Sequence, residues 1–77
     1  MKIILQHRTS RLFLSGRNDW TSDVKDARNF QQIVSAIDFV SAGRLTNLDV
    51  LMHFGDPRYD VRLPASPEDD SWNSQSL

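Results

Sequence analysis

The stretch that decides the fold is QQIVSAIDFVSAGRLTNLDVLMHF, residues 31–54, because a helical pattern is followed in it by a strand pattern. In its first half, apolar residues recur at the i, i+3, i+4 and i+7 positions of one helix face: Ile33, Ala36, Ile37 and Val40. This spacing predicts a helix over residues 31–42. Gly43 follows where a left-handed residue often ends a helix, and Leu45 is placed to close that end with an apolar contact.

In the second half of the stretch the apolar period changes to two, which predicts a strand over residues 48–54. We expect its even-numbered residues to face the helix, and Leu51 and His53 to face away. The cluster Gly55-Asp56-Pro57-Arg58 predicts a turn, and a last strand over residues 59–63 ends at Pro64. We therefore expect the helix to pack through Ile33, Ile37 and Val40 onto Val50, Met52, Val61 and Leu63.

Upstream of the helix, the short apolar runs 3–5 and 11–15 predict a β-hairpin. Residues 20–30 are less regular and suggest a brief helical turn before Phe30 enters the core. The predicted fold class is α+β, with ββαββ order and a small antiparallel sheet that carries one main helix on one face. We expect one domain over residues 1–64 and a disordered acidic tail over residues 65–77, whose composition is too polar to order itself.

The composition narrows the possible functions. A chain of 77 residues forms one domain, and the absence of cysteine excludes a disulfide framework and thiol metal sites. Nine Lys and Arg residues against ten Asp and Glu residues give a net charge of −1, which argues against a general nucleic-acid binder. The first apolar run is too short for a signal peptide, and no membrane span follows, so we expect a cytoplasmic protein without membrane contact.

One sequence pattern resembles that of small uncharacterised bacterial proteins. It consists of W-T-x-D-x-x-x-A-R-x-F at residues 20–30, a helix, and later F-x-D-P-R-Y-D at residues 54–60. The resemblance covers about half of the chain. It implies a bacterial origin and the same element order, and it transfers no activity and no site residue.

No pattern in the sequence carries a specific chemistry, so we expect no catalytic, cofactor or metal site. The histidines, His7 and His53, lack the ligand spacing of a metal site and are interpreted as solvent-side strand residues. The aspartates in or near turns are interpreted as side chains that bond nearby backbone amides; they are Asp19, Asp23, Asp56 and Asp60.

The outer face of the sheet is the most informative surface in the sequence. One helix covers only one face, so Phe13 and Leu51, together with either Ile4 or its neighbours Ile3 and Leu5, are expected to form an exposed apolar strip on the other face. Arg11, His53 and Arg62 border this strip. The predicted function is therefore a small non-enzymatic protein-interaction module, which forms a homodimer or binds a larger protein through Phe13, Leu51, His53, Arg11 and Arg62.

The alternative is a nucleic-acid-associated regulator. Arg8, Arg11 and Arg17 cluster in and around the first hairpin and are candidates for phosphate contacts. The same charges also suit an edge that is protected against aggregation. The acidic segment 67–72, with Trp72 at its end, is open to two interpretations, a docking peptide or a solubilising tail.

Overall fold

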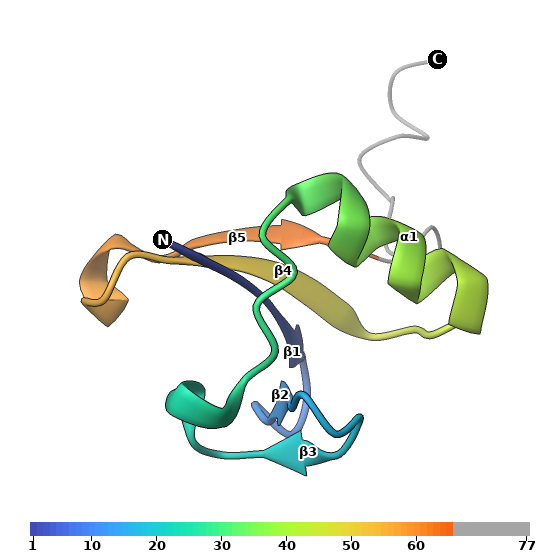
Figure 1. The fold of residues 1–77 in the computed structure, drawn as a ribbon, viewed down its shortest axis with the longest axis horizontal. Helices are drawn as coiled ribbons and strands as arrows, with labels where there is room; N and C mark the ends of the chain where they lie inside the picture. The colour runs from blue at the N-terminus through green and yellow to red at the C-terminus, as the bar shows by residue number, and fades with distance from the viewer. Residues whose placement is uncertain (66–77) are drawn as a thin grey trace.

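The computed structural model describes residues 1–65, which form a five-stranded antiparallel sheet and one α-helix (Figure 1). The elements in chain order are β1 (Lys2–His7), β2 (Phe13–Leu14), β3 (Trp20–Thr21), the 3-10 turn η1 (Val24–Asp26), α1 (Ile33–Gly43), β4 (Leu48–His53), the 3-10 turn η2 (Pro57–Tyr59) and β5 (Val61–Pro64). The strand order in the sheet is β3-β2-β1-β4-β5. The α+β class is confirmed. The order ββαββ is wrong, because a third short strand, β3, precedes the helix.

The central strands β1 and β4 are buried on both faces. In β1 the consecutive residues Ile3, Ile4 and Leu5 are at most 1% exposed, although neighbouring side chains in a strand point to opposite faces. In β4 the same holds for Val50 and Leu51, at 0% and 2%. A sheet with one open face would leave every second residue exposed, so something other than α1 must cover the outer face.

On the inner face, α1 packs across β1 and β4 through Ala36 and Val40, which are fully buried. The prediction that Ile37 belongs to this contact is wrong, since 37% of it is exposed. The helix is rotated so that Phe39, on the opposite flank, packs against Phe30 with ring centroids 5.4 Å apart. The small side chain of Ala36 then occupies the centre of the contact.

The sequence predicts Gly43 as the left-handed residue that ends the helix, but Gly43 is the last residue of α1 and the left-handed position is the next one. Arg44 adopts the left-handed conformation, with φ 52°, and its amide donates to the carbonyls of Ser41 and Val40. At Gly43 a Cβ would lie 3.3 Å from Cγ of Leu45, a tight contact that the Leu45 side chain would have to relieve by a small shift. Leu45 packs against the core, as predicted.

The outer face is covered by the chain segment between β3 and α1, residues 23–28, which we call the strap. Figure 1 shows the strap and α1 on opposite sides of the sheet. Val24 and Ala27 of the strap form a second apolar cluster with Ile4, Leu51 and Phe13. Lys2 Nζ donates to the carbonyl of Val24 at 2.9 Å, and the amide of Arg28 donates to Leu14 at 2.8 Å. The sheet is therefore the middle layer of three.

The C-terminal boundary differs slightly from the predicted one. Ala65, which the sequence assigns to the tail, is buried in the core, and its amide donates to the carbonyl of Leu48 at 3.1 Å. The rest of the predicted tail, residues 66–77, lies outside the described residues.

Candidate functional site

The apolar strip predicted on the outer face is not a surface. Leu51 is 2% exposed and Ile4 is fully buried, and Phe13 is half-buried against the same cluster. The expectation that these residues form an exposed strip is wrong, because the strap packs on them. Its irregular sequence gave no periodic signal of an element that covers a sheet face.

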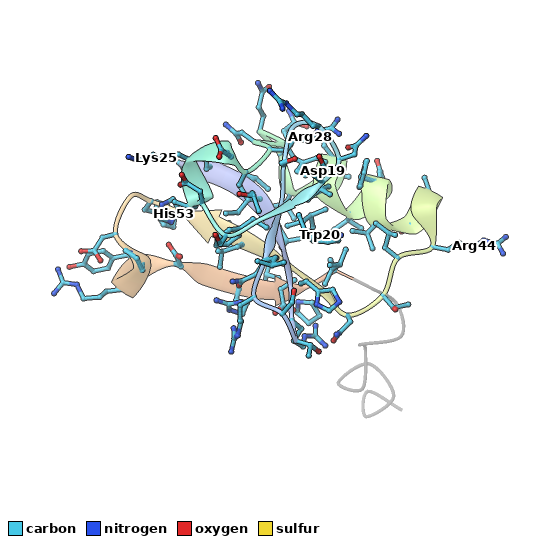
Figure 2. All side chains as sticks on the ribbon, turned by 90° about the horizontal axis from the view of Figure 1, so that it is seen from below. Asp19, Trp20, Lys25, Arg28, Arg44 and His53 are labelled. Carbon is cyan, nitrogen blue, oxygen red and sulfur yellow. The ribbon has the colours of Figure 1, made fainter. Side chains whose placement is uncertain are left out.

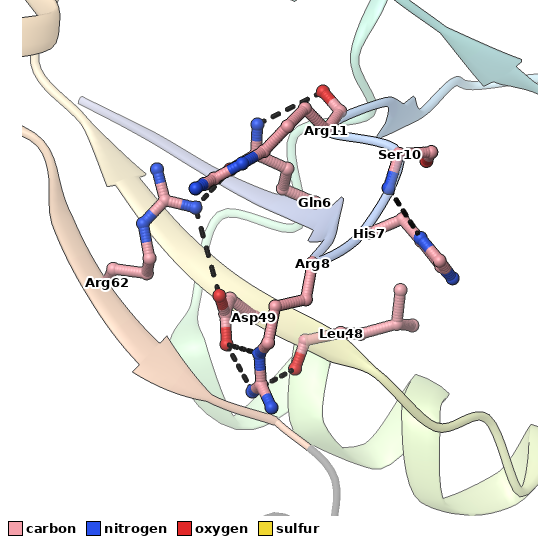
Figure 3. Close-up of polar contacts among 8 residues, drawn as sticks. All are labelled: Gln6, His7, Arg8, Ser10, Arg11, Leu48, Asp49 and Arg62. Carbon is pink, nitrogen blue, oxygen red and sulfur yellow. Dashed lines mark hydrogen bonds and ion pairs between the residues drawn. The ribbon is translucent and has the colours of Figure 1, made fainter.

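Of the bordering residues predicted from sequence, Arg11 and Arg62 reach the surface and lie in a polar network at one end of the outer face, whereas His53 lies outside it (Figure 3). Its centre is the carboxylate of Asp49, whose side chain is only 7% exposed. Arg8 Nη2 lies 2.5 Å from Oδ1 of Asp49, and Arg62 Nη1 lies 3.7 Å from Oδ2. Arg62 also donates to the side-chain oxygen of Gln6. Two cations, one that directly follows β1 and one on β5, stabilise this buried carboxylate.

Arg11 joins this group from the loop between β1 and β2. The carbonyl of Arg11 accepts a hydrogen bond from Gln6 Nε2 at 3.1 Å, which fixes the loop against β1. Its own backbone is left-handed, with φ 66°, and in Figure 3 its side chain and that of Arg62 point toward one another. We call Arg8, Arg11 and Arg62 the arginine cluster. Arg8 and Arg62 both contact the carboxylate of Asp49, and Arg11 contributes a third guanidinium group beside Arg62.

Arg17 is separate from the arginine cluster. It lies in the turn between β2 and β3 and lines a surface depression of about 600 Å³. Trp20 and Lys25, which are labelled in Figure 2, line the same depression. Asp19 and Asp26 line the same depression, so its charges balance. Of the three arginines predicted for phosphate contacts, the structure brings Arg8 and Arg11 together and leaves Arg17 outside.

The two histidines are far from forming a joint site. Lys2 pairs with His53 and His7 pairs with Leu48, so the histidines lie at opposite ends of the β1–β4 ladder and on opposite faces. His53 Nδ1 lies 2.9 Å from Oδ1 of Asp60, and each side chain is 14% exposed. Among residues 1–65, no group of three His, Asp or Glu residues is placed to hold a metal ion.

The turn aspartates largely have the structural roles predicted for them. Oδ1 of Asp23 accepts from the amide of Lys25 at 2.9 Å and begins η1. Oδ1 of Asp56 accepts from the amide of Arg58 at 3.0 Å and begins η2. The Arg58 guanidinium also holds the pKa of Asp56 below its ordinary value, through side-chain hydrogen bonds first and the backbone bond second.

A second candidate surface lies on the inner face, beside α1. Every residue of β5 is exposed, and Val61 and Leu63 are 43% and 37% exposed although they share a face with the buried Val50. Ile37 lies on the helix flank opposite Phe39. The Phe39 ring contacts Phe30 and the guanidinium of Arg28, so its flank of α1 faces the segment that leads into the helix. Ile37 is therefore on the β5 side of α1. We call Ile37, Val61 and Leu63 the apolar shelf.

The shelf was missed because the sequence pattern places these residues under the helix. Val61 and Leu63 alternate as a half-buried strand should, and Ile37 is in phase with Val40. An eleven-residue helix that packs on β1 and β4 does not extend over the edge strand. The sequence carries no signal that tells an apolar strand residue under the helix from one that lies beyond the helix.

Comparison with known proteins does not identify a relative: no family model, curated protein or solved structure matches the chain. No helix within residues 1–65 is long and apolar enough to cross a membrane. The argument for function therefore rests on the arginine cluster and the apolar shelf.

Proposed function

We propose that this protein is a non-enzymatic interaction module that self-associates through the apolar shelf. The observation that carries the proposal is the exposure of Val61 and Leu63 on the inner face of an edge strand, on the same side of the sheet as the exposed Ile37. Clustered apolar side chains on one face favour an interface over scattered surface residues. The surface differs from the one expected from sequence, but the class of function is the same.

The open edge of β5 supports a second copy of the chain as the partner. The amide of Ala65 donates to β4, so the odd-numbered residues of β5 bond to β4 and Arg62 directs its amide and carbonyl to the open edge. A two-fold axis at Arg62 would pair its amide with the carbonyl of the second copy. The same axis places Val61 of one copy beside Leu63 of the other, on the shelf side.

The charge on Arg62 does not oppose this pairing. Its side chain is on the outer face and is held toward β1 by Gln6 and Asp49, away from the open edge. Pro64 has no amide hydrogen, so the backbone hydrogen bonds between the two edges are confined to Arg62. The apolar contact between the two shelves must then supply most of the affinity.

The expected affinity is weak. Fully burying an aliphatic side chain contributes about 1.5–3 kcal/mol, so six side chains that are about 40% exposed contribute about 4–7 kcal/mol. Two backbone hydrogen bonds add about 1–3 kcal/mol, and the association cost is about 4–15 kcal/mol. The gain exceeds this cost by at most about 6 kcal/mol, so we expect weak association that is to be measured at protein concentrations of about 10 μM to 1 mM.

The test compares two substitutions of the full chain by sedimentation velocity across that concentration range. Leu63→Lys places a charge on the shelf and is expected to give a monomer at every concentration. Val34→Lys is the matched control, because Val34 is 57% exposed on α1 and lies outside the shelf; it should associate like the unmodified protein. Circular dichroism confirms that both variants fold. Equal association of the two variants would contradict the proposal.

A second candidate function is nucleic-acid association through the arginine cluster. The observation that favours it is that Arg8 and Arg62 meet at one carboxylate while Arg11 points toward Arg62, because guanidinium groups pair well with phosphate oxygens. Titration of a fluorescent single-stranded oligonucleotide tests it. Binding that weakens with salt and is lost in Arg11→Gln, but not in Arg17→Gln, supports this function. Equal loss in both variants contradicts the assignment to the cluster.

A further inference from the structure

We infer that the arginine cluster is a docking site for an acidic peptide, and that its occupant is the chain's own segment Glu68-Asp69-Asp70. This inference concerns the outer face and is independent of the apolar shelf. The two surfaces lie on opposite faces of the sheet, so either can be occupied without the other.

The first argument is the charge of the cluster. Arg8 and Arg62 both contact Asp49, and their side chains remain 37% and 40% exposed. Arg11 is also exposed and points toward Arg62 (Figure 3). Two like charges that face one another at the surface favour an anion between them, and a carboxylate is a good bidentate partner for a guanidinium.

The second argument is the place where the described chain ends. The amide of Ala65 donates to the carbonyl of Leu48 at 3.1 Å, and Arg8 Nη2 donates to the same carbonyl at 3.4 Å. Ala65 therefore lies directly beside the cluster. Glu68 follows three residues later in the sequence. Three residues span at most about 10 Å, so Glu68 is tethered within about 10 Å of Ala65, on the side of the cluster where Arg8 lies.

The third argument is complementarity. The segment carries three carboxylates in succession, and the cluster carries three guanidinium groups and one carboxylate. A short tether gives an effective concentration in the millimolar range, so weak charge-assisted contacts are enough for occupancy. An external polyanion would have to displace the segment, which makes the segment an intramolecular competitor at this site.

The absence of cysteine permits a direct test on the full chain. A nitroxide spin label is attached through Ser71→Cys, and paramagnetic broadening of backbone amides is measured by NMR against the diamagnetic label. Because residue 71 is close to Ala65 in sequence, some broadening near Leu48 is expected in any case. The deciding comparison is therefore between the labelled chain and the same chain with Glu68→Gln, Asp69→Asn and Asp70→Asn.

The inference predicts stronger broadening at Arg11 and Arg62 in the charged chain than in the neutralised chain. It also predicts that Arg11→Gln reduces this broadening and that salt removes it, because the Debye length falls from about 30 Å at 0.01 M to about 3 Å at 1 M. Equal broadening in the charged and neutralised chains would overturn the inference. Broadening that is strongest at Ile37 and Val61 would also overturn it, since the tail would then dock on the apolar shelf.

Discussion

The burial of Leu51 gives the sharpest prediction about the fold. Leu51 is 2% exposed and packs with Ile4 and Ala27 between the sheet and the strap. Leu51→Ala therefore removes a buried side chain and leaves a cavity, for which the usual cost is about 2–5 kcal/mol. For a domain of this size each kcal/mol lowers the melting temperature by about 4–8 °C, so we expect a decrease of at least about 8 °C.

The assay is urea denaturation followed by circular dichroism, at one fixed protein concentration for all variants. Leu63→Ala is the matched control, because it removes the same atoms from the neighbouring strand, where Leu63 is 37% exposed. Its cost should be clearly smaller than that of Leu51→Ala. If Leu51→Ala and Leu63→Ala cost the same, the strap does not cover the outer face and the three-layer description is wrong.

Three further predictions concern the helix, the buried carboxylate and an exposed turn. Ile37→Ala should cost less than about 2 kcal/mol, below the usual range for a buried isoleucine, and thermal denaturation should show Val40→Ala to be the more harmful although it removes fewer atoms. Asp49→Asn should cost about 1–3 kcal/mol in urea denaturation, because it weakens charge-assisted hydrogen bonds to two arginines. In an NMR titration the pKa of Asp56 should lie below its ordinary value and rise in Arg58→Gln; because that pKa is lowered by folding, the associated stabilisation is lost as pH falls through it.

The parts of the fold that periodic patterns describe were predicted from the sequence. Residues 31–54 carry the periods of a helix and a strand, and α1 and β4 form there with boundaries shifted by one or two residues. Facing within β4 is also correct, with Val50 toward the helix and Leu51 away from it. Local alternation is enough for this, because side chains in a strand must alternate between faces.

The strap was beyond such reasoning because its contacts are few and distant in sequence. Val24 and Ala27 are small apolar residues without a period, and their partners on β1 and β4 lie twenty or more residues away. These contacts decide whether a sheet face is open. The prediction that Phe13 and Leu51 point to the outer face was correct, but the prediction that they are exposed there was wrong, because the strap covers them. The arginine cluster was half-predicted, because Arg8 and Arg11 are neighbours in the chain and Arg62 is not.

The central claim, self-association through the apolar shelf, is tested most directly by the mass of the unmodified protein in solution. Sedimentation equilibrium over about 10 μM to 1 mM covers the protein concentrations at which the weak association expected for so small a contact is to be measured. The account predicts an average mass that rises with concentration from that of a monomer, 8.8 kDa, toward that of a dimer. A mass that stays at 8.8 kDa throughout this range would contradict it.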